Sequence, residues 1–300
     1  MKPIIEVKGA AKRRRDFRLG PLDLTVESGL IVALVGPNGS GKSTFFHLLM
    51  GLLQPEEGSI ELFGAKACPE RDVEIKSRTA YVGDSISPID ETMTVEAWKA
   101  FVSRWYPSWN EATWRRLSDR LELDPRKKLK ELSTGMAKRL AFALALSHDP
   151  ELLLLDEPSS GLDPFAWRIM MEEIHGFMDG RDRAVVVATH IMEEVRRLAD
   201  LIVFLYNGRI VGVYEKDQLL DDWKTIWTSD PADAVRQLPG VVAAEKVRGG
   251  GARLVTSDAR RTEAALRERG IAPVETRAVE LEDILWHLME QDKQRNGSVN

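Results

Sequence analysis

The stretch Gly36-Pro37-Asn38-Gly39-Ser40-Gly41-Lys42-Ser43-Thr44 decides the fold of this chain. It matches the phosphate-binding pattern G-x-x-x-x-G-K-[ST], and it lies between the apolar run Ile31–Val35 and the helical pattern Thr44–Leu53, the strand–loop–helix context that the pattern requires. Its glycines let successive backbone N–H groups face one anion, and the following helix adds the positive end of its dipole. We therefore expect the whole stretch to bind the phosphates of a nucleotide, with Lys42 at the β- and γ-phosphates and Ser43 on Mg²⁺.

Four further apolar runs resemble the one before this loop. None alternates strictly between apolar and polar residues, so each is typical of a strand that is buried on both faces of a sheet. Helical patterns separate several of them, which predicts a parallel sheet in an α/β core. The turn Asn207-Gly208 after the last run predicts a hairpin that closes the sheet with an antiparallel strand. The runs are Thr79–Val82, Leu152–Leu155, Ala184–Ala188 and Leu201–Leu205.

Polar residues follow these runs at the carboxyl ends of the predicted strands, where open α/β sheets place their ligands. Asp156 and Glu157 end the third run, and His190 ends the fourth. Asp156 suits a Mg²⁺ site, and Glu157 suits the general base that polarises an attacking water. His190 alone is more often a satisfied surface or core residue. Its place on the same edge as the phosphate loop favours contact with the γ-phosphate and a role in orienting that water.

In order and spacing, these segments resemble an ABC ATPase. The most diagnostic is Leu132-Ser133-Thr134-Gly135-Met136, which is similar to the signature L-S-G-G-Q, and Ser160-Gly161-Leu162-Asp163 adds to the match. The resemblance covers roughly residues 4–215. It implies a P-loop NTPase core in which two nucleotide-binding domains, as a homo- or heterodimer, hold ATP between the phosphate loop of one copy and the signature of the other. Ser133 and Gly135 would then contact the γ-phosphate across the interface, and Asp163 would link the two sites.

Three departures from the family pattern affect the site. Thr134 and Met136 replace a glycine and a glutamine of the signature. Asp84 stands where the family has a glutamine, and its carboxylate could hold Mg²⁺ or a water. The aromatic that stacks on adenine has a candidate in Phe17, although an Arg of the basic run 12–15 could stack instead. That run is more typical of a solvated loop than of a binding patch.

The departures also narrow the resemblance within the family. Asp84, the signature form and the segment Trp105–Asn110 resemble the bacterial ATPases of ABC-2-type transporters. Within these, the chain is similar to the YtrB group, which is linked to GntR operons and acetoin utilisation.

Composition excludes several other classes. The chain has 300 residues and a net charge of -5, so it is a poor candidate for binding nucleic acid. Its single cysteine, Cys68, rules out a disulfide framework within the chain. No apolar run approaches the roughly 20 residues that span a bilayer, and the N-terminus lacks a signal peptide. We expect a cytoplasmic protein, peripheral on the inner face of the cell membrane, with a separate transmembrane permease as its partner.

The chain divides into two predicted domains. Residues 1–220 form the nucleotide-binding domain, with a helical insert at about 88–149, and residues 221–300 form a small accessory domain. The accessory domain has the order β-α-β-β-α-β, a ferredoxin-like α+β arrangement, and could dimerise, regulate or cap the core. In the insert, Trp98, Phe101 and Trp105 share a helix face, which either packs inward or grips a coupling helix of the permease.

The sequence thus predicts the ATP-binding and ATP-hydrolysing subunit of an ABC transporter. Two alternatives stay open at this stage: a soluble ABC ATPase of the translation or DNA-repair type, and a nucleotide sensor that barely hydrolyses. Against the first, the chain has one phosphate loop and no sustained heptads. Against the second, it keeps Lys42, Asp156, Glu157 and His190.

Overall fold

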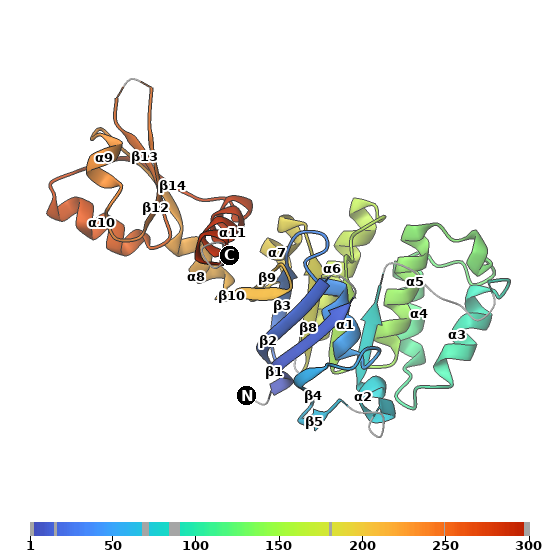
Figure 1. Ribbon diagram of the computed structural model, residues 1–300. Helices are drawn as coiled ribbons and strands as arrows, with labels where there is room; N and C mark the ends of the chain where they lie inside the picture. Colours follow the sequence, from blue (N-terminus) through green and yellow to red (C-terminus); the bar gives the residue numbers. More distant parts are fainter. Residues whose placement is uncertain are drawn as a thin grey trace. The chain divides into compact units, whose positions relative to one another are not determined.

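The computed structural model describes residues 3–14, 17–67, 72–83, 91–179, 182–248 and 250–296. The chain forms two compact units, Met1–Gly212 and Val213–Asn300 (Figure 1). The boundary predicted from the sequence, after residue 220, falls inside helix α8 (Lys216–Asp222). No helix in the described part of the chain combines the length and the apolar character needed to cross a membrane.

A six-stranded sheet forms the centre of the first unit, in the order β10-β9-β3-β8-β7-β6. Strands β9, β3, β8, β7 and β6 run parallel to one another. The two-residue turn Asn207-Gly208, with positive φ at both positions, joins β9 to β10. The five predicted strands and the hairpin are confirmed. Their bounds are β3 Ile31–Val35, β6 Thr79–Val82, β7 Leu152–Asp156, β8 Ala184–Thr189, β9 Leu201–Tyr206 and β10 Arg209–Glu215.

Apolar side chains cover both faces of this sheet. Consecutive residues of β7 alternate between two clusters: Leu153 packs with the helices on one face, and Leu154 packs with the N-terminal sheet and Phe46 on the other. Every residue of β3, β7 and β8 is buried. This two-sided burial is why the runs are continuously apolar.

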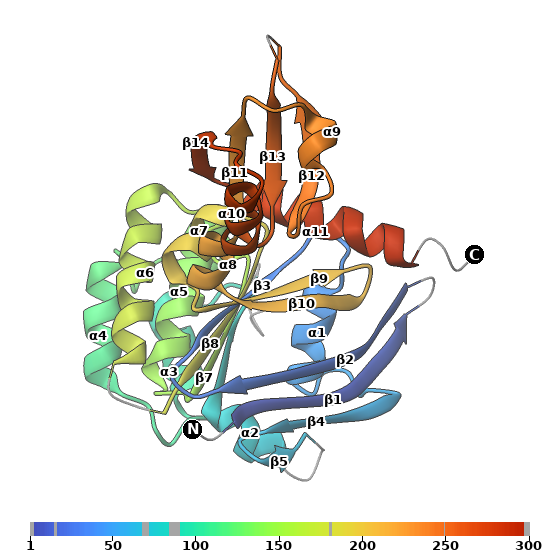
Figure 2. The same ribbon diagram turned by 90° about the vertical axis from the view of Figure 1, so that its left-hand side faces the viewer.

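A second, antiparallel sheet packs over one face of the first, with α1 between them (Figure 2). Its order is β2-β1-β4-β5. The sequence analysis does not predict this sheet, and it assigns the basic run 12–15 to a loop. That assignment is wrong for residues 12–14, which end strand β1. The bounds are β1 Pro3–Arg14, β2 Phe17–Glu27, β4 Glu57–Leu62 and β5 Ala65–Lys66.

The helices of the first unit lie around these sheets, and three of them form the insert. The Thr94 side chain accepts a hydrogen bond from the N–H of Ala97 at 3.2 Å and so forms the N-cap of α3. The bounds are α1 Lys42–Leu49, α2 Asp72–Arg78, α3 Val95–Ser103, α4 Glu111–Arg120, α5 Thr134–Ser147, α6 Pro164–Met178 and α7 Met192–Leu198, with a 3₁₀ turn at Leu129–Glu131.

The second unit contains a four-stranded antiparallel sheet in the order β12-β13-β11-β14. With two helices in the connections, this is the predicted ferredoxin-like order. Ile226, Leu254 and Leu266 belong to its small apolar core. The bounds are β11 Lys224–Thr228, α9 Ala232–Val235, β12 Val241–Lys246, β13 Ala252–Thr256, α10 Ala259–Glu268, β14 Pro273–Ala278 and α11 Leu281–Asn296.

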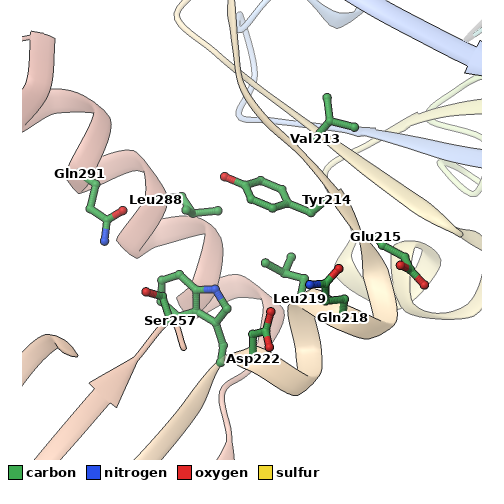
Figure 3. A pocket seen from close by; sticks show the side chains of 10 residues that line it. Val213, Tyr214, Glu215, Gln218, Leu219, Asp222, Ser257, Leu288 and Gln291 are labelled. Carbon is green, nitrogen blue, oxygen red and sulfur yellow. The ribbon is translucent and has the colours of Figure 1, made fainter. Parts of the chain in front are cut away.

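A hollow of about 350 Å³ opens within this second unit. Figure 3 shows the Tyr214 ring between Leu219 and Leu288, with Gln291 and Asp222 at the rim. Its lining combines the aromatic rings of Tyr214 and Trp223 with leucines, amides and carboxylates, and it includes no Lys or Arg from the described residues. It carries none of the residues that the motifs single out.

Candidate active site

The phosphate loop connects β3 to α1. Gly41 has a φ of 113° and forms the N-cap of α1 without a side-chain hydrogen bond, so the first N–H groups of the helix remain available to a ligand. A Cβ at this position would come within 2.9 Å of the Phe17 ring. Glycine is therefore required both by the left-handed backbone and by the close approach of Phe17.

Lys42 is enclosed by its own loop. Its side chain is 7% exposed, and Nζ donates to the carbonyl of Gly36 at 2.7 Å and to that of Pro37 at 3.4 Å. The same Nζ lies 3.8 Å from Oε1 of Glu157. The loop thus holds a buried positive charge beside the acidic strand end, where phosphate oxygens would exchange for the carbonyls.

The acidic strand end is fixed through its backbone. Asp156 is buried, and the Tyr81 hydroxyl donates to its Oδ2 at 3.4 Å. The Glu157 N–H donates to the carbonyl of Ala188 at 2.8 Å, and Nζ of the buried Lys138 donates to the Glu157 carbonyl at 2.6 Å. These bonds hold Glu157 at a φ of 46°, in the left-handed region that disfavours side chains other than glycine.

His190 is paired with this glutamate. Its Nδ1 lies 2.8 Å from Oε2 of Glu157, and its side chain is 55% exposed. Because a carboxylate only accepts, the pairing places the proton on Nδ1 and leaves Nε2 directed to other partners. The pair therefore presents one carboxylate that is oriented by an imidazole.

A cleft of about 510 Å³ brings these groups together. Most of the predicted nucleotide and metal residues line it, including Phe17 and the two candidate Mg²⁺ ligands Ser43 and Asp156. Arg14, which belongs to the basic run that was named as an alternative source of the adenine-stacking residue, lines the same cleft. The lining residues are Arg14, Phe17, Asn38, Gly39, Gly41, Lys42, Ser43, Thr44, Asp156 and Glu157.

The signature residues form a separate group. The Ser133 side chain caps α5 by accepting from the Met136 N–H at 3.3 Å. A Cβ on Gly135 would come within 2.3 Å of the carbonyl of Gly161, so the signature packs directly on the loop that leads to Asp163. None of Ser133, Gly135 and Asp163 is among the described residues that line the cleft.

Asp163 caps the next helix. Its Oδ1 accepts from the N–H groups of Phe165 and Ala166 at 3.0 Å each, and its Oδ2 pairs with Arg139. The Ala166 N–H, with the charge of Arg139 and the Phe165 N–H, lowers the pKa of the Asp163 carboxyl. The predicted metal ligand Asp84 lies outside the described residues.

Comparison with known proteins identifies the family. The model of the ABC transporter family matches residues 19–160. The Nod factor export ATP-binding protein I of Burkholderia lata is 30% identical over 301 residues, which cover 97% of this chain and 98% of that protein. The chain belongs to the ABC transporter family.

Other members of the ABC transporter family agree with this assignment. The Nod factor export ATP-binding protein I of Rhizobium sp. (strain N33) is 29% identical over 98% of this chain and 99% of that protein. The solved structure of an ATP-binding subunit of an ABC transporter matches with a TM-score of 0.66 and 26% identity, over 73% of this chain and 92% of that one. A nucleotide-free ATP-binding cassette has the same fold, with a TM-score of 0.59 at 21% identity over 71% of this chain and 91% of that one.

The function follows from membership of the ABC transporter family and from these relatives. The protein is an ATP-binding subunit of an ABC transporter, and it is an ATP hydrolase. The predicted fold class, enzyme class and transport function are confirmed in preference to the soluble ATPase and the nucleotide sensor. The finer resemblance to the YtrB group stays a prediction.

Two residues that shape this ABC site were not predicted from the sequence, and a third, Arg14, was named only as part of the basic run that could stack on adenine. Arg14 reaches the cleft because β1 and β2 pair, with Arg14 opposite Phe17. Lys138 is 1% exposed within α5, and Tyr81 reaches Asp156 from the neighbouring strand. The one available signal was Lys138 itself, because it follows the signature by one helical turn and faces an otherwise apolar side of α5.

Proposed function

We propose that two copies of the ATP-binding unit close on two ATP molecules and that this closure drives a separate membrane permease. The observation that supports it is the separation of the site into two groups. The cleft holds the phosphate loop, Asp156 and Glu157, whereas Ser133 and Gly135 lie outside its lining. Each copy would supply its signature to the cleft of the other.

Within one cleft, the roles follow from charge and reach. Lys42 and the N–H groups at the start of α1 bind the β- and γ-phosphates. Glu157 accepts a proton from the attacking water, and the imidazole of His190 keeps the carboxylate oriented and reaches the γ-phosphate through Nε2. Phe17, packed against Gly41 at the mouth of the loop, stacks on the base, with Arg14 beside it.

The donor set at Ser43 and Asp156 fits Mg²⁺. A buried carboxylate and a hydroxyl line the same cleft, and both offer the hard oxygen ligands that this ion prefers. When bound, Mg²⁺ neutralises charge that develops on the phosphates.

The permease would dock on the helical insert. Trp98 is buried and stacks on Phe101, whose ring in turn meets Trp105. Trp105 lies just after the end of α3, outside the helix face predicted for it, and is 71% exposed. A hollow of about 210 Å³, lined by Tyr81, Gly83, Trp98 and Tyr106 among others, lies between the insert and β6. Docking here would hold the protein at the inner face of the membrane, and the export names of the relatives favour outward transport.

The variant Glu157→Gln tests the proposal. Removing a general base costs roughly 10²–10⁴-fold in rate, so we expect phosphate release to fall by at least about 10²-fold. Because ATP binding is kept, the chain should elute as an ATP-dependent dimer in gel filtration. The control is Glu74→Gln, an exposed carboxylate on α2.

Turnover near the wild-type rate in Glu157→Gln would remove Glu157 from the mechanism. A chain that stays monomeric with ATP, while binding it, would remove the two-copy site.

A further inference from the structure

Glu194 is a buried acid that the proposed mechanism does not use. It lies on α7 and is 2% exposed. Both of its carboxyl oxygens are buried without a hydrogen-bond partner among the residues that the structure describes. Burying such a group without a partner is unfavourable, so its presence beside the active site calls for a physical role.

Its surroundings connect two parts of the site. The hydroxyl of Thr189, the last residue of β8, lies near its carboxyl, and so does that of Ser159 in the loop after Glu157. Thr189 directly precedes His190 and pairs with Val35, which leads into the phosphate loop. Ser159 accepts the Leu162 N–H at 3.0 Å and so belongs to the turn before Asp163.

The environment favours the neutral form of this acid. Burial raises the pKa of Glu194, and the nearby charge of Glu157 raises it further, while the hydroxyls of Ser159 and Thr189 and the charge of His190 act in the opposite direction. On its own helix, Glu193 is exposed and paired with Arg197. The net direction is upward, so this acid ionises at a higher pH than a free glutamate.

We propose that Glu194 is a positioning residue that ties the end of β8 to the loop after Glu157 and thereby fixes His190 against Glu157. A neutral acid carries one donor and one acceptor, which match the two hydroxyls with small movements of the side chains. The ionised form can only accept, and it adds a second negative charge that competes with Glu157 for His190. The same group would therefore support the pair while it is protonated and disturb the pair once it ionises.

Three variants of the full chain test this role through kcat, the KM for ATP and the pH profile of ATP hydrolysis. Glu194→Ala should lower kcat at least tenfold with a change of KM below about twofold, because it misplaces the pair and leaves phosphate binding intact. Glu194→Gln keeps a donor and an acceptor without a titrating proton. It should restore most of the lost kcat and extend the active range to more alkaline pH than in the wild type.

The matched control is Glu193→Gln, its exposed neighbour, which should leave kcat and the pH profile unchanged. The proposal is overturned if Glu194→Gln has the wild-type alkaline limb, if it is as slow as Glu194→Ala, or if Glu194→Ala retains the wild-type kcat. Where Glu194→Ala does not fold, the pH profile of Glu194→Gln alone decides.

This inference rests on the proposed roles of Glu157 and His190. An active Glu157→Gln variant would contradict those roles. The proposal for Glu194 is contradicted instead by the pH profile of Glu194→Gln, measured in a chain with Glu157 intact.

Discussion

The nucleotide cleft and the signature group treat their polar groups in opposite ways. In the cleft, Lys42 and Asp156 are buried, and Lys42, Glu157 and His190 form one connected set of polar groups. In the signature group, Ser133 and Asp163 are exposed, and the side chain of each caps the N-terminus of the helix that follows it. The first region is built to hold charge, and the second presents helix N-termini at a surface. This is the division that a site shared between two copies requires.

The largest effect expected on the cleft side comes from Lys42→Ala. Removing a buried cation that stabilises the transferred phosphoryl group should reduce ATP hydrolysis about 10³-fold, measured as phosphate release at saturating ATP. Lys76→Ala, which removes an exposed lysine paired with Asp72, is the control. A loss below tenfold in Lys42→Ala would show that the cleft does not depend on this charge.

The signature side is tested by a pair of variants at Ser133. Asp and Asn are as good N-caps as Ser, so both keep α5 folded, but only Asp brings a negative charge toward a phosphate. We expect Ser133→Asp to lose about 10²-fold in ATP hydrolysis and Ser133→Asn to keep most of it. Equal activities would place the signature away from the nucleotide.

Mixing the two defective chains sharpens the comparison. A dimer of one Lys42→Ala chain and one Ser133→Asp chain contains one site with both defects and one intact site. Random pairing makes half of the dimers mixed, so activity should return to about a quarter of the wild type if the sites act independently. No recovery, with mixed dimers demonstrated by a tag on one chain, would contradict a shared site.

The end of the signature helix carries a pH-dependent weakness. His148, the C-cap of α5, is 3% exposed and stacks on Tyr106 with 4.0 Å between ring centroids. Burial lowers its pKa to about 4. Because the unfolded chain takes up a proton near pH 6.5 and the folded chain does not, stability falls as the pH drops from 6.5 toward 4.

Urea unfolding at two pH values measures this weakness. When the pH drops from 7 to 5, the unfolding free energy of the wild type should fall by about 2 kcal/mol more than that of His148→Phe. The reason is that the phenylalanine has no proton to take up. His175→Gln, on the exposed side of α6, should follow the wild type. An unchanged acid dependence in His148→Phe would remove His148 as its source.

The smallest effect concerns the insert alone. Thr94→Ala removes the N-cap of α3 and should cost about 1 kcal/mol in unfolding free energy, while ATP affinity in the cleft stays the same. Thr94→Ser keeps the cap and is the control. A loss of ATP affinity in Thr94→Ala would mean that insert and cleft are not separable.

How much of the fold could be predicted depended on where each strand lies. The central strands are buried on both faces, so each shows as a continuous apolar run. Strand β1 could not be recognised, because its register shifts between Val7 and Ala10 and between Ala10 and Lys12, which breaks the two-residue period. The same irregularity hid the strand position of Arg14 and so its place in the cleft.

The site was predictable where residues that act together are also neighbours in the sequence. The phosphate loop and the pair Asp156-Glu157 are local motifs, so their residues could be named without a structure. Contacts between distant segments were not predictable: Lys138 reaches the Glu157 carbonyl from α5, and Glu194 approaches Ser159 from α7. These depend on how helices pack, which no local spacing encodes.

The left-handed backbone at Glu157 has an evolutionary consequence. A glutamate there is held in a conformation that costs of order 1–3 kcal/mol, and glycine would adopt it without that cost. Laboratory selection for heat resistance alone, with no demand for ATP turnover, should therefore drift toward glycine at this position. The most heat-resistant variants would then be the ones that no longer hydrolyse ATP.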